Sequence, residues 1–336
     1  IQKVVCSLSG GKPITRVTSN KLKIENQSVK QKDLEKIEKI NNQNKIDNYL
    51  LLSSTPIKFV IDNNNIVDNP VGMHTEVLTV DLANIYGNEV VIKNITHAVE
   101  LCHLLVEKFI ITPEASGISC MIKDERYEGA TIIDLGETIT SIGIFVNNKI
   151  IFSDSIPIGG VHITSDIVRG LGTKAEEAEK IKILHGSAQM NELDEFTNIK
   201  IPVISEDGEI IDQQIPKAML TAIIKPRIEE IFEIINKRLN YFKLNSFYMN
   251  KIILSGGGAN LNNIRELASN YFNSNVRIGR PIGLIGLPDI AQTPAFACLS
   301  GLLLKSLEKE KKLNSRSNPK YYKYFGKVGG WFQENL

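Results

Sequence analysis

The chain has 336 residues, of which 42% are hydrophobic and 23% charged, and its net charge is +1 at pH 7. This length favours two lobes over one small core, and the near-neutral charge argues against a nucleic-acid-binding protein. The four cysteines lie far apart with no Cys-x-x-Cys pair, so we expect reduced thiols in a cytosolic setting and no metal site. No run of about 18 apolar residues is present, which excludes a membrane-spanning helix.

The first 87 residues alternate between strand and helix signals. Two strand-like runs, "KVVCSL" and "PITRVTSNKLKI", precede the polar helix-forming stretch "SVKQKDLEKIEKINNQ". The stretches "YLLLSSTPIKFVIDNN" and "TEVLTVDLA" then return to strand. We interpret residues 1–87 as one small α+β unit.

A helix is expected over residues 88–111, because apolar residues recur there at helical spacing and Asn88 can cap its start. After a short link containing Pro113 comes a hairpin, "TIIDLGETITSIGIF", which spans residues 131–145. A turn of small residues between two such strands can close its backbone N–H groups on a phosphate. Asp134, at the end of the first strand, suits Mg²⁺-bound or attacking water, or alternatively a simple turn.

We expect the second half of the chain to contain several helices and two further strands. We expect a helix over residues 166–171 capped by Thr164 or Ser165, and a second helix capped by Thr173. Residues 190–215 are polar and rich in turn residues. The long helix "KAMLTAIIKPRIEEIFEIINKRLNYF" should kink or restart at Pro226. A strand, three glycines and a helix follow in "KIILSGGGANLNNIRELASNYF", and "VRIGRP" and "PAFACLSGLLLKSL" predict an edge strand and a buried helix.

Two local patterns in this half suggest ligand contacts. Three consecutive glycines, 256–258, lie between a strand and a helix, where they allow close approach of the backbone to a ligand, although a tight turn is the plainer interpretation. Glu179 and Lys182 are three residues apart on one helix face. They form either a ribose or base contact or an ordinary surface ion pair.

The C-terminal stretch "YYKYFGKVGGWFQENL" is amphipathic and carries the only Trp of the chain. Aromatic residues and lysines at helical spacing suit a helix lying in the plane of a membrane interface, or alternatively one docked on the protein's own core. The charged, turn-rich residues 308–320 before it predict a flexible linker. We therefore expect a tethered membrane contact, made by the following side chains: Lys323, Phe325, Lys327, Val328, Trp331, Phe332 and Leu336.

Taken in chain order, these segments resemble the FtsA family of actin-like bacterial cell-division proteins. The resemblance is carried by the hairpin with Asp134 and by the stretches "IPIGGVHITSDI", "EEAEKIKILHGSA", "AIIKPRIEEIFEII", "LSGGGANLNNI", "VRIGRPIGLIGL" and "PAFACLSGLLL", followed by the amphipathic tail. It implies an α/β actin-like (ribonuclease H-like) fold with two lobes around a nucleotide cleft, an incomplete first lobe and an inserted α+β subdomain.

The resemblance also implies a division of the chain. The parts are 1–87 (small α+β subdomain, 1C or SHS2-like), 88–130 (remainder of the first lobe), 131–165 with 252–307 (core of the second lobe), 166–251 (its outer subdomain), 308–320 (linker) and 321–336 (membrane-targeting helix).

Roles for single residues follow from the same resemblance. Asp134 and Gly136 match the second phosphate loop, and Glu179 and Lys182 match the pair that meets the nucleoside. The glycines of the adenosine-side turn are Gly256, Gly257 and Gly258. Arg227 and Arg238 would contact the acidic C-terminal tail of the tubulin-like protein FtsZ. ATP with Mg²⁺ is the family's cofactor.

The implied function is to tether FtsZ filaments to the cytoplasmic face of the inner membrane at the division site. Recruitment of other division proteins and self-association into filaments belong to the same expectation. We expect no enzymatic role and no nucleic-acid partner. Membrane lipid is the expected ligand of the C-terminal helix.

Two departures from the family pattern predict weak or absent ATP binding by this chain. The chain begins after the first-lobe strands and first phosphate loop that open the family's sequence. The hairpin tip also carries Glu137, Thr138 and Ile139 where small residues are usual, and a carboxylate repels phosphate.

Three alternatives stay open. An actin-fold ATPase or sugar kinase would need a water-activating acid, yet the register places Thr112 where related ATPases hold a carboxylate. A pilus-assembly scaffold would bind an inner-membrane pilus protein in place of FtsZ. A degenerate fragment would have no cellular role.

Overall fold

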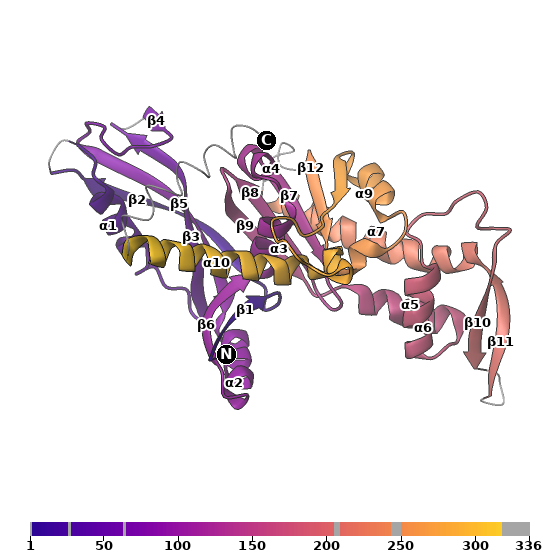
Figure 1. The fold of residues 1–336 in the computed structure, drawn as a ribbon. Coiled ribbons are helices and arrows are strands. Elements are labelled where there is room, and N and C mark those ends of the chain that lie inside the picture. Colours follow the sequence, from indigo (N-terminus) through magenta and orange to yellow (C-terminus); the bar gives the residue numbers. More distant parts are fainter. Residues whose placement is uncertain (1, 26–27, 63–64, 205–208, 243–249, 318–336) are drawn as a thin grey trace.

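The computed structural model of the chain describes residues 2–25, 28–62, 65–204, 209–242 and 250–317. Figure 1 shows an elongated molecule with a four-stranded sheet at one end, the β10–β11 hairpin at the other and a five-stranded sheet between them. This mixed α/β architecture agrees with the expected fold class.

The four-stranded antiparallel sheet has the order β2-β5-β3-β4 and carries helix α1 on one face. Its elements are β2 (Ile14–Lys23), α1 (Gln31–Asn41), β3 (Tyr49–Ile61), β4 (Asn65–Val67) and β5 (Val77–Asn88). Val29 and Ile37 are buried against Leu78, Val80 and Leu82 of β5. Leu34 of α1 packs against the same cluster, so the apolar side of α1 faces its sheet.

The first strand does not belong to this unit. β1 (Lys3–Leu8) pairs in parallel with β6 (Leu105–Ile111), in a sheet of two strands within the described residues. The boundary expected at residue 1 is thus too early by one strand, because the partner of β1 lies about a hundred residues further along the chain.

Only the first part of the segment 88–111, which was expected to be one helix, is helical, and its last seven residues form a strand. α2 (Glu89–Leu101) begins at its predicted cap, where Asn88 Oδ1 accepts from the N–H groups of Val90 (3.0 Å) and Val91 (3.2 Å). The chain then turns at His103, whose φ is 58°, and enters β6. Pro113 lies in the first turn of α3 (Thr112–Cys120) and not in a link, because proline is well tolerated there. The short helix α4 (Lys123–Glu128) follows.

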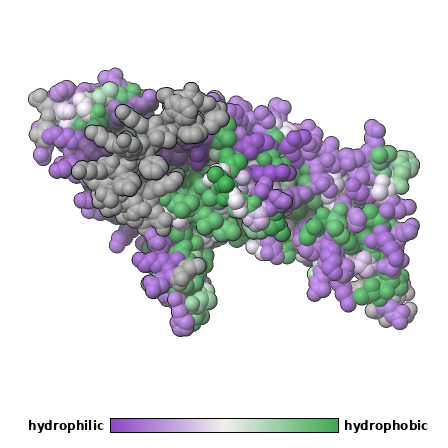
Figure 2. All heavy atoms as spheres, viewed as in Figure 1, coloured by the Kyte–Doolittle hydropathy of each residue, from purple (hydrophilic) through white to green (hydrophobic). Residues whose placement is uncertain are grey.

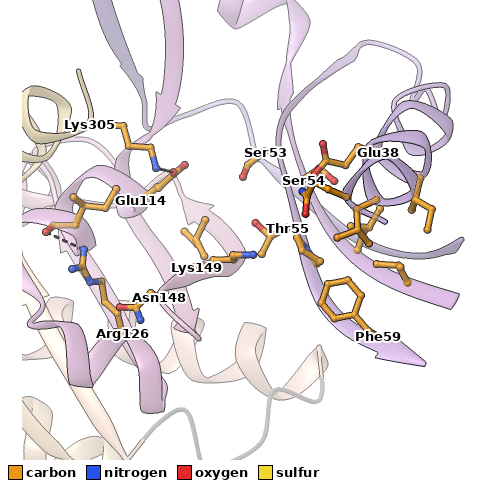
Figure 3. Close-up of a pocket in the computed structure, with 18 of the residues that line it drawn as sticks. Glu38, Ser53, Ser54, Thr55, Phe59, Glu114, Arg126, Asn148, Lys149 and Lys305 are labelled. Carbon is orange, nitrogen blue, oxygen red and sulfur yellow. Dashed lines mark hydrogen bonds and ion pairs between the residues drawn. The ribbon is translucent and has the colours of Figure 1, made fainter. Parts of the chain in front are cut away.

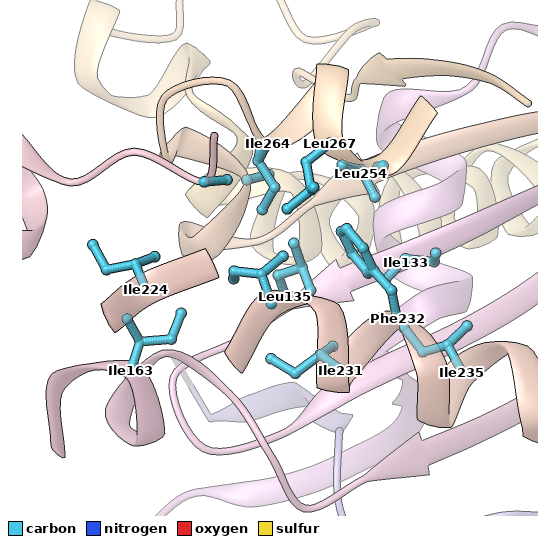
Figure 4. Packing of buried hydrophobic residues seen from close by; sticks show 14 of the residues in the cluster. Ile133, Leu135, Ile163, Ile224, Ile231, Phe232, Ile235, Leu254, Ile264 and Leu267 are labelled. Atoms are coloured by element: carbon cyan, nitrogen blue, oxygen red, sulfur yellow. The ribbon is translucent and has the colours of Figure 1, made fainter. Parts of the chain in front are cut away.

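The five-stranded sheet has the order β13-β12-β7-β8-β9. Its strands are β7 (Ala130–Leu135), β8 (Thr140–Val146), β9 (Lys149–Ile156), β12 (Lys251–Ser255) and β13 (Asn275–Ile278). The predicted hairpin is β7–β8, and "VRIGRP" lies at the sheet edge as predicted. Figure 4 shows Ile133, Leu135 and Leu254 from this sheet packed against Ile231 and Phe232.

Over the range expected for the outer subdomain, the structure contains the helices α5 (Gly160–Leu171), α6 (Ala175–His185) and α7 (Lys217–Tyr241) and the strands β10 (Asn198–Ile204) and β11 (Ile210–Pro216). Helix α5 crosses the expected boundary at residue 166. The polar stretch expected to be irregular contains this antiparallel hairpin. α7 continues through Pro226 without a restart. Its apolar stripe, which includes Ile228, Ile231 and Ile235, is buried as expected.

Both predicted caps in this region are wrong. α5 begins six residues early, with Gly159 as its N-cap, so Thr164 and Ser165 lie within the helix and donate to the carbonyls of Gly160 and Val161. The hydroxyl of Thr173 donates instead to Pro202 O at 2.5 Å, which leaves Lys174 as the N-cap of α6. Thr164 and Ser165 thus bond carbonyls of their own helix, and only for Thr173 does a distant carbonyl outcompete the local helix end.

After β12 the chain forms a 3₁₀ turn (Gly257–Asn260), α9 (Ile264–Phe272), two further 3₁₀ turns (Asp289–Gln292, Pro294–Phe296) and α10 (Ala297–Ser317). The expected linker is wrong as far as Ser317, because α10 continues through it. The stretch 321–336, expected to be a membrane-targeting helix, lies outside the described residues. Over the described part of the chain, no helix is both long and apolar enough to cross a membrane.

Candidate functional site

The turn of the β7–β8 hairpin is fastened to the start of α5. Gly136 N donates to Ile139 O at 3.1 Å and closes the turn. Gly160 N and Val161 N then donate to the carbonyls of Gly136 (2.9 Å) and Glu137 (2.8 Å). A Cβ at Gly159 would lie 2.5 Å from Gly136 O, so only glycine allows the two segments to approach this closely.

Asp134 lies beneath this turn and is 7% exposed. Its Oδ2 accepts hydrogen bonds from Ser116 Oγ (2.5 Å) and Ser255 Oγ (3.0 Å). Burial raises the pKa of the Asp134 carboxyl, and the two serine hydrogen bonds oppose that rise. The side chain therefore ties β7 to α3 and β12 and supports the turn from behind.

The three consecutive glycines have different structural reasons. Gly256 has φ 81° and ψ 170°, a conformation open essentially to glycine alone, and a Cβ there would lie 2.6 Å from Leu135 O. A Cβ at Gly258 would lie 2.9 Å from Leu135 Cβ. Gly257 faces open space with no atom within 4 Å of such a Cβ. Gly256 and Gly258 are thus required by the close packing of the turn against Leu135, whereas Gly257 borders open space.

Glu179 and Lys182 form an ion pair on the inner side of α6. Lys182 Nζ lies 2.7 Å from Glu179 Oε2 and also donates to Thr164 Oγ1 (2.8 Å) and Gly160 O (3.1 Å). Burial of Glu179 raises its pKa, but the hydrogen bonds from Lys182 and Thr164 outweigh this and lower it. The lysine therefore connects α6 to the start of α5.

These segments enclose a cavity of about 440 Å³, which we call the cleft cavity. The described residues that line it are Gly136, Glu137, Gly160, Ile163, Glu179, Lys182, Ile183, Gly186, Gly257, Gly258, Asn260 and Leu261. Five of the seven residues expected at a nucleotide site line it, and the other two, Asp134 and Gly256, support it from behind. Backbone, three apolar side chains and an ion pair suit a flat heterocycle joined to a sugar.

Sequence reasoning had placed Glu137 at the tip of the phosphate hairpin, but it missed the other lining residues. Gly160 was detectable, because Gly159-Gly160 ends a strand in the same way as the turn at 256–258. Gly186 and Leu261 carried no local signal, and only the packing of α6 against the turn after β12 places them here. A Cβ at Gly186 would lie 2.9 Å from Leu261 Cδ1.

A second cavity of about 820 Å³ opens between the four-stranded sheet and the α3–α4 region, and we call it the interdomain cavity. Figure 3 shows Glu38, Ser54 and Phe59 on one side of it and Arg126 and Lys149 on the other. Four basic side chains and two acidic ones line it, namely Lys123, Arg126, Lys149, Lys305, Glu38 and Glu114. No sequence motif predicted this cavity.

The two arginines expected to contact a partner lie on α7, and both have partners within the chain. Arg227 donates to both carboxylate oxygens of Asp166, at 2.6 and 2.9 Å, and also pairs with Glu230. Arg238 Nη1 lies 3.2 Å from Asp154 Oδ2. An incoming carboxylate would have to share these guanidinium groups.

The outer subdomain also exposes apolar side chains. Ile210 and Ile211 of β11 are 54% and 49% exposed, and Phe196, just before β10, is 82% exposed. Figure 2 shows apolar atoms gathered over the β10–β11 hairpin at the lower right. Exposed apolar patches of this kind often mark interaction surfaces.

Among the described residues, no group of three or more His, Cys, Asp or Glu side chains is arranged to hold a metal ion. The free thiols of Cys120 and Cys298 have their pKa values raised to about 11 by burial. These thiols are therefore protonated at neutral pH.

Comparison with known proteins decides the family. The family model described as "Cell division protein FtsA" matches residues 131–301, and the model "SHS2 domain inserted in FTSA" matches residues 10–86. The chain belongs to the FtsA family. It is 31% identical to FtsA of Agrobacterium fabrum over the whole chain and 77% of that relative, and 27% identical to FtsA of Escherichia coli K12 over 99% of the chain and 80% of that relative. As a member of this family, it is a cell-division protein.

Solved structures agree with the actin-like fold of FtsA. MreB5 of Spiroplasma citri bound to ADP matches with a TM-score of 0.54 and 22% identity over 69% of this chain and 68% of MreB5. A PilM–PilN type IV pilus biogenesis complex matches with a TM-score of 0.60 and 15% identity over 90% of this chain and 79% of the other. The SHS2 match corresponds to the four-stranded sheet with α1, which confirms an inserted α+β subdomain.

Proposed function

We propose that this FtsA-family chain is an adaptor that tethers FtsZ filaments to the cytoplasmic face of the inner membrane and binds an adenine nucleotide in the cleft cavity. The observation that carries the proposal is the match to FtsA over the whole chain, with the inserted SHS2 subdomain in place. Recruitment of other division proteins and self-association into filaments follow as part of the same role. The proposal assigns no turnover to the chain.

Nucleotide binding is supported by the cleft cavity and by the fold. Gly136 and Gly160 on one side and Gly257 and Gly258 on the other leave the backbone open to a ligand. MreB5, which shares the fold, carries ADP in its structure. ATP with Mg²⁺ is the family's cofactor, and we expect this chain to bind it weakly, with Glu179 and Lys182 facing the nucleoside.

Binding of the FtsZ tail is proposed at the outer subdomain, with Arg227 and Arg238 as contacts. The two arginines are 11 residues apart, so they lie on one face of α7, roughly 17 Å apart along its axis. Basic groups at this spacing suit an extended acidic peptide. Fluorescence anisotropy of a labelled FtsZ tail peptide would test this.

We expect the variant Arg238→Ala to weaken binding of the peptide about tenfold, because Arg238 is the more exposed of the two arginines. Arg265→Ala is the matched control, since Arg265 is exposed on α9 and pairs with its neighbour Glu266. Equal affinities for Arg238→Ala and the unmodified chain would remove Arg238 from the proposed interface.

Membrane tethering is proposed for the C-terminal stretch. Its aromatic residues and lysines suit the interface of an anionic bilayer. Deletion of residues 321–336 should abolish co-sedimentation with liposomes that contain phosphatidylglycerol. If the shortened chain still sediments with the liposomes, the tether lies elsewhere in the chain.

A pilus-assembly scaffold is the second candidate, and the likeness to the PilM–PilN complex favours it. At 15% identity this likeness concerns the fold alone, whereas the FtsA match extends to sequence. Parallel pull-downs with an FtsZ tail peptide and a PilN peptide would separate the two candidates.

A further inference from the structure

The cleft cavity carries an unusual charge for a phosphate-binding site. Its described lining holds three ionisable side chains, Glu137, Glu179 and Lys182, so the sum of their charges at pH 7 is −1. The single cation is already engaged by Glu179 Oε2 at 2.7 Å and Thr164 Oγ1 at 2.8 Å. No uncompensated positive charge on these lining residues is therefore left for a phosphate.

Glu137 is held in place by its backbone. Its carbonyl accepts from Val161 N at 2.8 Å, and a Cβ at Gly159 would lie 2.6 Å from that oxygen. These contacts fix the main chain of Glu137 at the cavity, and its exposed side chain belongs to the residues that line it. Within the described residues its carboxylate forms no ion pair, so its negative charge is unneutralised.

These charges decide which ligands the cavity accepts. A free nucleoside triphosphate brings about four negative charges, a Mg²⁺ complex brings two fewer, and a nucleoside brings none. Like charges at short range repel strongly where water is partly excluded. The neutral base and sugar keep the contacts offered by Ile163, Ile183 and Leu261 in every case.

We propose that the cleft cavity selects its ligand by phosphate charge, that it prefers a neutral nucleoside to a free nucleoside triphosphate, and that Glu137 sets this preference. The inference rests on the proposed nucleotide-binding function of the same cavity. Glu137 acts here as a residue that determines specificity and not as a catalytic residue.

Isothermal titration calorimetry on the full chain tests the proposal. Adenosine, ADP and ATP are titrated separately in buffer with EDTA and in buffer with excess Mg²⁺. We expect adenosine to bind about tenfold more tightly than Mg²⁺-free ATP. Excess Mg²⁺ should reduce this difference in affinity, because it neutralises part of the phosphate charge. A higher salt concentration should also reduce the difference in affinity, because salt screens the repulsion.

The isosteric variant Glu137→Gln separates charge from shape. It should raise the affinity for Mg²⁺-free ATP about tenfold and leave the affinity for adenosine unchanged. Glu195→Gln is the matched control, because Glu195 is exposed and lies outside the lining of the cavity, yet the variant changes the net charge of the chain equally. It should change neither affinity.

Two results would overturn the proposal in different ways. If the unmodified chain binds Mg²⁺-free ATP as tightly as adenosine, or if Glu137→Gln leaves ATP affinity unchanged, the charge selection is wrong while nucleotide binding stands. If adenosine, ADP and ATP all fail to bind both the folded chain and Glu137→Gln, the nucleotide-binding function itself fails, and the charge selection with it.

Discussion

The cleft cavity and the interdomain cavity differ in what their walls are made of. Five glycines line the cleft cavity, so its shape is set mainly by the main chain. The interdomain cavity contains no glycine in its lining and is shaped by side chains from α1, β3, α3, α4 and α10. Their ionisable residues sum to −1 in the first and +2 in the second.

This comparison shows how differently the two cavities respond to mutation. Where closely packed main chain forms or supports the wall, a methyl group added at a crowded glycine must move a strand or a turn, which lowers stability. Where side chains form the wall, substitutions change charge and volume with little effect on stability. The exception is a substitution in a buried hydrogen-bond network behind the wall, such as that of Asn41 and Asn84.

The largest effect is expected for Gly256→Ala at the cleft cavity. The new Cβ would meet Leu135 O at 2.6 Å and Asp134 Oδ1 at 2.8 Å, in a backbone conformation that alanine avoids. The free energy of unfolding should fall by about 3 kcal/mol or more. Urea denaturation measures it.

Gly257→Ala is the matched control for this change. No atom lies within 4 Å of a Cβ at Gly257, so its stability should stay within about 0.5 kcal/mol of the unmodified chain. The added methyl group would project toward the cavity and should weaken adenosine binding. Equal destabilisation by both variants would contradict the idea that the wall at Gly256 is fixed by the main chain.

An intermediate effect is expected beside the interdomain cavity for Asn84→Ala. Asn84 is fully buried and exchanges hydrogen bonds of 2.7 and 3.0 Å with Asn41 at the end of α1. Its loss would leave the Asn41 amide without that partner and should cost about 2 kcal/mol. Hydrogen exchange of the α1 amides measures the loss locally.

The exposed Asn44→Ala serves as its control and should leave exchange unchanged. Adenosine affinity should stay the same in both variants, because the network lies in the SHS2 subdomain. A parallel loss of adenosine binding in Asn84→Ala would show that the two cavities are coupled, and would end their treatment as independent regions.

The smallest effect is expected for Glu125→Gln in α4, the helix that brings Lys123 and Arg126 to the interdomain cavity. Glu125 accepts from Arg277 at 2.7 and 2.5 Å. Burial raises the pKa of Glu125, but the hydrogen bonds and charge of Arg277 outweigh it and lower the pKa. At pH 7 the variant should be less stable by about 1 kcal/mol.

The pH dependence gives this prediction its sign. A carboxyl whose pKa is lowered in the folded state adds stability above its ordinary pKa, and that stability is lost as pH falls through the lowered pKa. The difference between the two chains should therefore shrink as the pH falls below the ordinary pKa of glutamate and disappear below the lowered pKa of Glu125. Glu128→Gln, which removes an exposed pair with Lys251, should show a smaller difference at pH 7.

Local patterns predicted most of the elements and five of the twelve residues that line the cleft cavity. The hairpin of β7 and β8, the α7 stripe and the cap at Asn88 all depend on neighbouring residues, so they were readable in the sequence. The errors arose where distant partners decide the structure. The residues of β6 fit a helical period, but pairing with β1 makes them a strand.

The caps at Thr164 and Thr173 failed for different reasons. Thr164 lies inside α5, where its hydroxyl bonds Gly160 O and Glu179 on the next helix, whereas the hydroxyl of Thr173 bonds Pro202 on β10. Each hydroxyl could have capped a helix end, but it bonds another acceptor instead. Hydroxyl groups are satisfied equally well by either kind of partner. Sequence alone does not rank the two.

The sequence by itself determined the family, the division role and the glycine-rich turns of the cleft, because these depend on residue types at short spacing. Tertiary structure alone decided that β1 belongs with β6, that Lys182 also bonds Thr164 and Gly160 on α5, and that an interdomain cavity exists. Each of these depends on contacts between segments far apart in the chain. Packing and charge balance there are set by residues that are close in space but distant in sequence, so no local pattern predicts them.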